Sequence, residues 1–196
     1  MTAPHPQGPL LVATGNPDKL RELREALPGV ELEPLPPEVE LPPEDGETFA
    51  ANALTKARAT WTASGRPAIA DDSGIEAAAL DGRPGVRSAR YAGERASDEA
   101  NTALLLTELA GSEDRRVAYV CALAYVDARG EWLFEGRCEG TAAEAPRGAG
   151  GFGYDPVFQL ADGRTMAELT PEQKHAISHR GQAARQLGEW LAAQRQ

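Results

Sequence analysis

The sequence has few cysteines and no long apolar run. Cys121 and Cys138 are the only cysteines among 196 residues, so small buried thiols in a reducing compartment are expected rather than a disulfide framework. No stretch approaches the roughly 20 apolar residues of a membrane span. Residues 1–9 contain three prolines and no apolar core, which argues against a signal peptide. We therefore expect a cytoplasmic protein that has no membrane segment.

The sequence also lacks a surplus of basic residues. It has 20 Lys and Arg against 30 Asp and Glu, which gives a formal net charge of −10. Nucleic acids and anionic membranes attract basic surfaces, so neither is an expected partner. A few local cations can still bind an anionic small molecule. The length suits one domain or two closely joined lobes, with residues 1–9 as a disordered tail and the domain over residues 10–196.

Short apolar runs alternate with segments of helical periodicity. In the first half, these patterns predict strands at 10–13, 30–35, 68–70 and 74–80, and helices over 20–27 and 48–63, the second capped by Thr48. In the second half, they predict a helix over 98–110, strands over 117–126 and 132–138 that form a hairpin, and two C-terminal helices, the first beginning at Thr170 and Pro171. Because early strands alternate with helices and later strands pair with each other, we expect a mixed α/β sheet.

Two adjacent carboxylates follow the predicted strand at 68–70. The motif is Asp71-Asp72-Ser73-Gly74. Strand ends in open α/β sheets border the ligand crevice, and neighbouring strand residues point to opposite faces, so the two carboxylates should have different tasks. Asp, Ser and Gly also form turns, so a plain surface turn is the alternative.

A glycine-containing loop joins the first predicted strand to the first helix. Thr14-Gly15-Asn16-Pro17-Asp18-Lys19 offers backbone N–H groups, a helix N-terminus and the Lys19 ammonium to an anion such as phosphate. The Gly-x-x-x-x-Gly-Lys-Ser/Thr spacing of a P-loop is missing, and no serine lies in a nucleophile elbow. A capped turn that binds nothing is the alternative.

Acidic residues precede the helix predicted over 48–63, and Glu44 is one of them. Mg²⁺ prefers hard oxygen ligands from one or two carboxylates, completed by substrate phosphates and water. Glu44 is therefore a candidate magnesium ligand. Alternatively, these carboxylates only complement the dipole of the helix that follows.

Two later segments contain the residue types of a base pocket. Residues 147–155 combine glycines with Phe152, Tyr154 and Asp155, so a backbone can approach the ligand while a ring stacks on it and a carboxylate bonds it. Three potential cations then occur within seven residues: Lys174, His179 and Arg180. A flexible hairpin loop and ordinary surface charge are the alternatives.

Five motifs, in this order, resemble the inosine/xanthosine triphosphate pyrophosphatase family and span residues 14–180. They are Thr14-Gly15-Asn16-x-x-Lys19, Asp71-Asp72-Ser73-Gly74, Pro84-Gly85-x-x-Ser88-Ala89-Arg90-Tyr91, Gly151-Phe152-Gly153-Tyr154-Asp155-Pro156 and Lys174-x-x-Ile177-Ser178-His179-Arg180. The resemblance implies hydrolysis of ITP, dITP and XTP to the monophosphate and pyrophosphate, with Mg²⁺ as cofactor and a homodimer as the working unit. It also implies one domain over residues 10–196 with an elongated α/β fold, in which helices flank a long, twisted mixed sheet and the active site lies in a cleft between two lobes.

The resemblance also implies roles for individual residues. Asp72 would accept the proton of the attacking water and bind the metal, with Glu44 and Asp71 as further metal candidates. The substrate-binding residues would be Thr14, Gly15, Asn16, Pro17, Asp18, Lys19, Ser73, Phe152, Gly153, Tyr154, Asp155, Lys174, His179 and Arg180. Among them, Phe152 would stack on the base and the last four would line the base pocket. Cations at O6 and a carboxylate at N1–H would favour a 6-oxopurine over adenine, which presents the reverse pattern.

One position departs from the family pattern. The metal-binding glutamate is expected three residues before Gly46, where this chain has Pro43, and Glu44 follows one residue later. Either the loop shifts its register or the metal relies on Asp71, Asp72 and water. Two other functions are alternatives: a Maf-like pyrophosphatase acting on pyrimidine or modified nucleotides, and a nucleotide-binding sensor that has lost catalysis.

Overall fold

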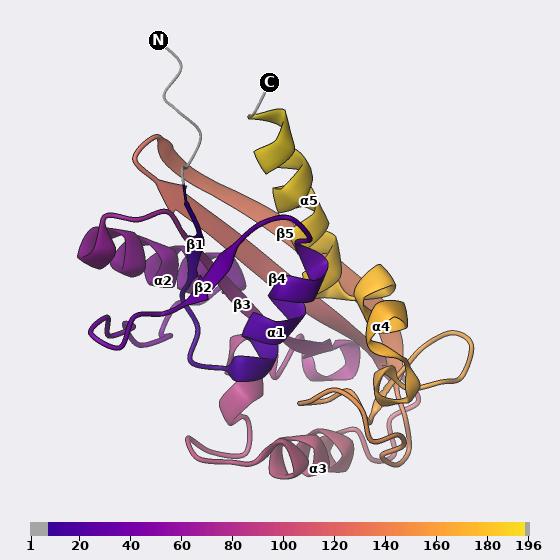
Figure 1. The fold of residues 1–196 in the computed structure, drawn as a ribbon. Helices are drawn as coiled ribbons and strands as arrows, with labels where there is room; N and C mark the ends of the chain where they lie inside the picture. The colour runs from indigo at the N-terminus through magenta and orange to yellow at the C-terminus, as the bar shows by residue number, and fades with distance from the viewer. Residues whose placement is uncertain (1–7, 195–196) are drawn as a thin grey trace. The chain divides into compact units, whose positions relative to one another are not determined.

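The computed structural model describes residues 8–194, so most of the predicted tail over residues 1–9 lies outside the described residues. The strands are β1 (Leu10–Val12), β2 (Leu32–Pro34), β3 (Ala68–Ala77), β4 (Arg116–Asp127), β5 (Gly130–Ala142) and β6 (Phe158–Gln159) (Figure 1). The α-helices are α1 (Pro17–Ala26), α2 (Phe49–Ser64), α3 (Asp98–Glu108), α4 (Pro171–Ile177) and α5 (His179–Ala193). Three short 3₁₀ helices complete the described elements: η1 (Ala78–Leu80), η2 (Gly85–Arg90) and η3 (Met166–Glu168). No helix in this part of the chain is long and apolar enough to cross a membrane.

The strands form a mixed sheet, which confirms the predicted α/β class. Their order is β2-β1-β3-β4-β5-β6. Strand β1 pairs in parallel with β2 and with β3, whereas β6 pairs antiparallel with β5. The predicted helix over 48–63 is α2: Thr48 Oγ1 accepts the N–H of Ala51 at 3.1 Å, and the helix ends at Gly65, whose φ of 67° is left-handed.

The chain divides into two compact units, which we describe separately. Unit 1 comprises the chain up to Asp72, Cys121–Gly136 and the chain from Arg180, and unit 2 comprises Ser73–Val120 and Arg137–His179. Strands β3, β4 and β5 therefore contribute residues to both units. Two of the boundaries, after Asp72 and after His179, fall inside motifs that carry predicted site residues. The predicted cleft between two lobes stays a prediction.

The core of unit 1 is formed by one face of its strands together with α1 and α5. Val12 and Ile69 on that face pack in one cluster with Leu23 of α1 and Leu187 of α5. Because side chains alternate along a strand, the neighbours of Ile69 point to the other face. This alternation continues into the two aspartates of β3 and decides which helix each of them meets.

The core of unit 2 is a second cluster, to which β3, α3, β4 and β6 contribute Ile75, Leu105, Tyr119 and Phe158. The predicted buried thiols are confirmed, since both cysteines are free and buried. Tyr119 is the member of this cluster that matters for the site, because it combines a buried ring with a hydroxyl group that needs a partner.

Strand β3 differs from the prediction of a strand, a turn and a second strand over residues 68–80. It runs without interruption from Ala68 to Ala77, so Asp71, Asp72 and Ser73 lie within a strand, and residues 78–80 form η1. The prediction that the strand ends at Ala70 was wrong because two adjacent carboxylates, a serine and a glycine are typical of a strand end or a turn. Helices on both faces of the strand supply ion-pair and hydrogen-bond partners, and a paired carboxylate can remain in a buried strand.

Candidate active site

The loop before α1 is organised by its own side chains. Asn16 caps the helix: its Oδ1 accepts the backbone N–H groups of Asp18 and Lys19 at 2.8 and 3.3 Å, and Pro17 takes the first helical position. Thr14 Oγ1 accepts the N–H of Asn16 at 3.1 Å. Because the Asn16 side chain already holds two helix N–H groups, the positive charge that this loop offers to a phosphate comes from Lys19.

Asp71 and Asp72 point to opposite faces of β3, as predicted, and meet different helices. Asp71 Oδ2 lies 3.2 Å from Lys19 Nζ of α1 and accepts hydrogen bonds from Arg180 Nε and Nη2 of α5 at 3.1 and 2.9 Å. Asp72 Oδ2 accepts a hydrogen bond from Asn52 Nδ2 of α2 at 2.9 Å. Both carboxylates are buried. Asp71 is thus held by full charges, whereas this bond to Asp72 comes from a neutral amide.

The different partners move the two pKa values in opposite directions. Burial by itself would raise the pKa of Asp71, but Lys19, Arg180 and Lys56 outweigh it and hold that pKa well below its usual range. Burial raises the pKa of Asp72. Its cationic neighbours lower it again, but only in part, so the net pKa stays above the usual value. Asp71 is therefore fixed as an anion, and Asp72 is the carboxylate that can take up a proton.

Lys56 of α2 is a member of this cluster that the sequence reasoning missed. Its buried ammonium contacts Glu44 Oε1, donates to the backbone oxygen of Asp71 at 2.7 Å and lies 3.8 Å from Asp72 Oδ1. Burial lowers the pKa of Lys56, but Asp71, Asp72 and Glu44 outweigh it, so the net pKa is raised and the side chain stays protonated. Glu44 and Asp72, two of the predicted metal ligands, therefore both approach one ammonium group, and metal binding by Glu44 stays a prediction.

The oxygen atoms around Lys56 are of the kind that Mg²⁺ prefers. Two carboxylates and a backbone carbonyl converge on one cation, so the position has the charge and the ligand chemistry of a cation site. Among residues 8–194, no group of three or more His, Cys, Asp or Glu residues is arranged to hold a metal. Two protein carboxylates, Glu44 and Asp72, match the small protein share that Mg²⁺ takes beside phosphate and water. The Asp71 carboxylate is directed to Lys19 and Arg180 instead.

Asn52 is a second residue of α2 that was missed. Its Nδ2 donates to Asp72, and its Oδ1 accepts the N–H of Gly46 at 2.8 Å, in the loop that carries Glu44. It is buried, as is Lys56 one helical turn later. Two polar side chains at i and i+4 on the buried side of a helix were the signal in the sequence that could have identified both residues.

Arg180 was predicted for the base pocket, and its guanidinium lies in unit 1. In addition to Asp71, it bonds Glu22 Oε2 of α1 at 2.5 Å from Nη1, and both side chains are buried. Burial lowers the pKa of Arg180, but the two carboxylates outweigh it and raise the pKa, so the charge is permanent. Glu22 was missed because it occupies a polar position of an amphipathic helix. A direct contact of Arg180 with a base stays a prediction.

In unit 2, the carboxylate of Asp155 brings together the predicted base-pocket residues. Its Oδ2 accepts hydrogen bonds from Lys174 Nζ at 2.5 Å and from the N–H of Phe152 at 2.9 Å, and its Oδ1 accepts one from the Tyr119 hydroxyl at 3.1 Å. The Lys174 ammonium lies 4.9 Å from the centre of the Phe152 ring. Gly151, with a φ of 72°, has no room for a Cβ beside this carboxylate. Phe152, Asp155 and Lys174 thus form one cluster.

His179 joins this cluster through Tyr119. The Tyr119 ring stacks on His179 with ring centres 4.6 Å apart and on Phe158 with centres 4.4 Å apart. Sequence reasoning assigned Tyr119 only to a strand. The signal was a tyrosine within an apolar strand, because a buried tyrosine hydroxyl usually has a polar partner.

The remaining predicted residues of unit 2 stabilise the loop around Phe152. The N–H of Gly153 donates to Asp98 Oδ2 at 2.6 Å, and the buried Tyr154 donates its hydroxyl to the backbone oxygen of Ser88 at 2.8 Å. Ser88 Oγ in turn accepts the N–H of Ile75 at 2.9 Å. The side chain of Tyr154 therefore anchors the loop from within the core. Ser73 lies half-buried where β3 enters unit 2.

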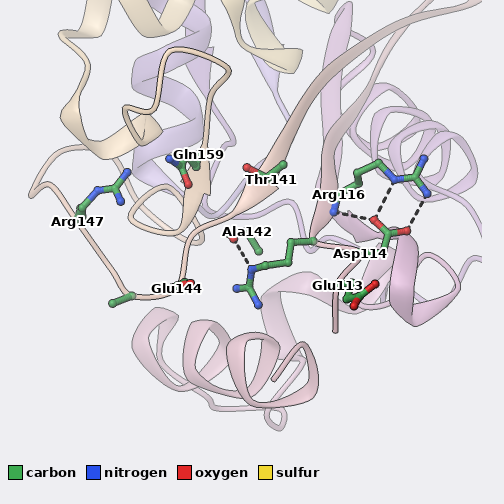
Figure 2. Close-up of a pocket in the computed structure, with 10 residues that line it drawn as sticks. Glu113, Asp114, Arg116, Thr141, Ala142, Glu144, Arg147 and Gln159 are labelled. Atoms are coloured by element: carbon green, nitrogen blue, oxygen red, sulfur yellow. Dashed lines mark hydrogen bonds and ion pairs between the residues drawn. The ribbon is translucent and has the colours of Figure 1, made fainter. Parts of the chain in front are cut away.

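A hollow of about 760 Å³ in unit 2 contains no predicted site residue (Figure 2). Its arginines are engaged with the chain itself. Arg115 donates to the backbone oxygens of Ala142 and Ala143, each at 2.8 Å, and Arg116 pairs with Asp114 at 2.7 Å. These contacts stabilise the strand ends, so the cluster around Asp155 is the better candidate for a ligand site in this unit.

Known proteins resemble this chain over most of its length. The dITP/XTP pyrophosphatase of Geobacter sulfurreducens is 50% identical, covering 94% of this chain and 97% of that protein, and the one of Geobacillus kaustophilus is 50% identical, covering 92% of each. The solved structure of a HAM1 protein from Coxiella burnetii matches with a TM-score of 0.87 at 40% identity, covering 95% of this chain and 100% of that one. The sequence profile of the Ham1 family matches residues 10–190, and the relatives confirm the resemblance drawn from the five motifs. The chain belongs to the Ham1 family.

Proposed function

We propose that the protein hydrolyses noncanonical purine nucleoside triphosphates, such as ITP, dITP and XTP, to the nucleoside monophosphate and pyrophosphate. The names of the relatives, dITP/XTP pyrophosphatases that are half identical to this chain, support the substrate class. The observation in this chain that carries the proposal is the environment of Asp72. It is a buried carboxylate with a raised pKa, bonded by Asn52 and close to the Lys56 ammonium.

In this proposal, Asp72 accepts the proton of the attacking water. A general base is most effective when its pKa lies near the working pH; burial alone moves the pKa of Asp72 in that direction, and Mg²⁺ on the same carboxylate would lower it again. The hydrogen bond from Asn52 orients the carboxylate. Lys19 and Lys56 supply positive charge for the phosphate oxygens, where negative charge is concentrated during phosphoryl transfer. Asp71 orients Lys19 by its ion pair.

We propose Mg²⁺ as the cofactor, held by Glu44 and Asp72. The support is the closeness of the two carboxylates, since both approach the Lys56 ammonium, and a Mg²⁺ ion between them would displace that ammonium toward the phosphate oxygens. The chemistry that Mg²⁺ would supply there is neutralisation of phosphate charge and a lower pKa of bound water. The remaining ligands would be phosphate oxygens and water, as is usual for Mg²⁺.

The Asp155 cluster of unit 2 provides the groups for base recognition. Phe152 offers a ring for stacking, and Asp155 holds the Lys174 ammonium beside that ring. An ammonium can donate to O6 of hypoxanthine or xanthine, whereas adenine has an amino group at this position and leaves the donor unpaired. A site built on such hydrogen bonds rejects the wrong ligand by a factor of about 10⁴.

We also propose that the protein acts in the cytoplasm as a homodimer, as the family resemblance implies. Size-exclusion chromatography with light scattering tests the assembly. A mass near twice that of the 20.8 kDa chain is expected, and a mass equal to that of one chain would contradict the dimer.

The function is tested by separating the products formed from ITP, XTP, GTP and ATP, with Mg²⁺ or with EDTA. The wild-type protein should form monophosphate and pyrophosphate from ITP and XTP, and EDTA or Asp72→Asn should abolish the reaction. Asp127→Asn is the matched control, because it neutralises another buried carboxylate of unit 1, one that bonds Tyr125 and Arg129. A diphosphate product, or equal turnover of ATP, would overturn the proposal. Binding without turnover would identify the sensor instead.

A further inference from the structure

Tyr119 contacts two of the residues predicted to line the base pocket. Its hydroxyl donates to Asp155 Oδ1 at 3.1 Å, and its ring stacks on the imidazole of His179 with an interplanar angle of 16°. The ring also stacks on Phe158 at 12°, and the residue is buried. None of the five motifs includes Tyr119.

We propose that Tyr119 is a positioning residue that sets the base selectivity of the site, by fixing the Asp155 carboxylate with its hydroxyl and the His179 imidazole with its ring. The inference rests on the proposed function, because it concerns how the same pocket distinguishes a 6-oxopurine from adenine. Tyr119 itself need not touch the nucleotide.

Several hydrogen-bond donors converge on the carboxylate of Asp155. Asp155 accepts from Tyr119 on Oδ1, and from Lys174 and the N–H of Phe152 on Oδ2. The hydroxyl therefore bonds a different oxygen from the one that accepts from Lys174 and Phe152, which limits rotation of the carboxylate. The ammonium of Lys174 and the backbone of Phe152 depend on the same carboxylate. If the carboxylate rotated more freely, the Lys174 ammonium and the Phe152 ring would no longer be held in one position relative to the base.

The contributions of the hydroxyl and of the ring of Tyr119 can be tested separately by substitution with phenylalanine. Phenylalanine retains the ring and its place between Phe158 and His179, but it cannot donate to Asp155. Tyr119→Phe thus removes one hydrogen bond to a charged group and leaves the stack in place. Lys19, Lys56 and Asp72, which we propose act on the phosphates, belong to unit 1. The loss of this hydroxyl is therefore expected to affect binding of the base and not the chemical step.

The same strand offers a matched control. Tyr125 of β4 is also buried, and its hydroxyl donates to the Asp127 carboxylate at 2.8 Å. Its ring packs at an angle against Trp132 and Trp190. Tyr125→Phe removes the same kind of bond from the same strand, so a general loss of stability should appear in both variants.

The experiment measures kcat and KM for ITP, XTP and ATP with the wild-type protein and the two variants. Tyr119→Phe is expected to lower kcat/KM for ITP and XTP by about tenfold, mainly through KM, because a hydrogen bond to a charged group is worth about that factor. Turnover of ATP should be unchanged, so the ratio of ITP to ATP falls. Tyr125→Phe should leave the ratio at the wild-type value. A ratio that Tyr119→Phe leaves unchanged would overturn the inference, as would an equal fall in both variants.

Failure of the proposed function can be distinguished from failure of this inference. If the wild-type protein hydrolyses neither ITP nor XTP, binding of IMP and AMP is measured by calorimetry with the same three proteins. A preference for IMP that only Tyr119→Phe loses would support the positioning role. Equal affinity of the wild-type protein for both nucleotides, or no binding of either, would overturn it.

Discussion

Each unit of the molecule contains an aspartate–lysine pair whose aspartate is buried, and the surroundings of the two pairs differ. In unit 1, Asp71 lies 3.2 Å from Lys19, and in unit 2, Asp155 lies 2.5 Å from Lys174. Further charged residues surround or extend the first pair: Glu22, Glu44, Lys56, Asp72 and Arg180. Aromatic side chains surround the second pair: Tyr119, Phe152 and His179.

The difference matches the roles proposed for the two clusters, with phosphate contacts assigned to unit 1 and base recognition to unit 2. Burying charged groups costs desolvation free energy, which their ion pairs offset only in part. Such a network therefore contributes little net stability to a fold. It is suited to a ligand that brings several negative charges of its own, such as a triphosphate. One ion pair beside flat rings is suited to a purine base, which offers a π face and a few directed hydrogen-bonding groups.

Unit 1 contains the same contrast on a smaller scale, between neighbouring residues of β3. Asp71 is anchored by Lys19 and Arg180, and its pKa is lowered, whereas Asp72 is bonded by an amide and its pKa is raised. The alternation of a strand is the cause, because it directs one side chain to α1 and α5 and the next to α2. Asp71 is therefore held as an anion by its ion pairs, and Asp72 is the carboxylate to which we assign the proposed role of general base.

The largest expected effect tests that division of tasks. Asp72→Asn should lower kcat by about 10³-fold, as expected for loss of a general base, while the protein remains folded because the amide has the size of the carboxylate. Steady-state kinetics with ITP measures the loss, and thermal unfolding of the same variant verifies the fold. A variant with a wild-type kcat would show that Asp72 is not the base.

The next effect is the counterpart at Asp71 and concerns stability. Asp71→Asn leaves Lys19 and Arg180 without their shared carboxylate, and breaking a buried pair costs about 3 kcal/mol in the free energy of unfolding. Urea denaturation measures this value. Asp114→Asn is the control, because its exposed ion pair with Arg116 should contribute little. Equal losses in the two variants would contradict the structural role of Asp71.

The lowered pKa of Asp71 predicts how its contribution to the free energy of unfolding changes with pH. The folded-state pKa of Asp71 lies below its usual value, so its ionised form stabilises the fold fully above the unfolded-state pKa of about 3.9. That contribution is lost progressively as the pH falls below this value. The difference in unfolding free energy between wild type and Asp71→Asn should therefore shrink as the pH is lowered from about 5 to about 2. A difference that does not change with pH would mean that the charge of Asp71 does not stabilise the fold.

Several features of both units could be predicted from the sequence because they depend on neighbours along the chain. The cap of α2 by Thr48 and the opposite directions of Asp71 and Asp72 are of this kind. The continuity of β3 through the two aspartates could not be predicted, since it depends on partners from distant segments. Arg180 is 109 residues from Asp71 along the chain.

The missed site residues have the same explanation. Glu22, Asn52 and Lys56 occupy polar positions of helices, a pattern that is typical of solvent-facing side chains. Tyr119 occupies a position in an apolar strand that is typical of a core residue. Their sequence signals are weak, and the contacts to Arg180, Asp72, Glu44 and Asp155 are what assign these residues to the two clusters.

A smaller effect is expected from the aromatic side of unit 2. Phe152→Ala removes the ring on which the base is proposed to stack, and stacking is worth about 2 kcal/mol, or about thirtyfold in kcat/KM. The loss should appear in KM for ITP, with little change in kcat, because the reacting atoms belong to the phosphates. Phe152→Tyr retains a flat ring and should recover most of the affinity. If Phe152→Tyr were as weak as Phe152→Ala, stacking would not be the role of this residue.

The smallest effect separates positioning from stability by comparing one asparagine from each unit. Asn52 and Asn101 are equally buried, and the side-chain amide of each both accepts and donates a hydrogen bond. Asn101 accepts the N–H of Ala92 and donates to the backbone oxygen of Ala89, whereas Asn52 accepts the N–H of Gly46 and donates to the Asp72 carboxylate. Only the second bridge ends on the proposed base.

Alanine at either position should therefore destabilise the protein to a similar extent, since each substitution removes two comparable hydrogen bonds. Asn52→Ala alone should lower kcat, by about tenfold, because Asp72 then loses the bond that orients it. Kinetics at a temperature well below both unfolding transitions makes the comparison. If Asn101→Ala lowered kcat equally, the effect of Asn52 would be one of stability. If only Asn52→Ala lowers kcat, the side-chain amide of Asn52 orients the Asp72 carboxylate for proton transfer.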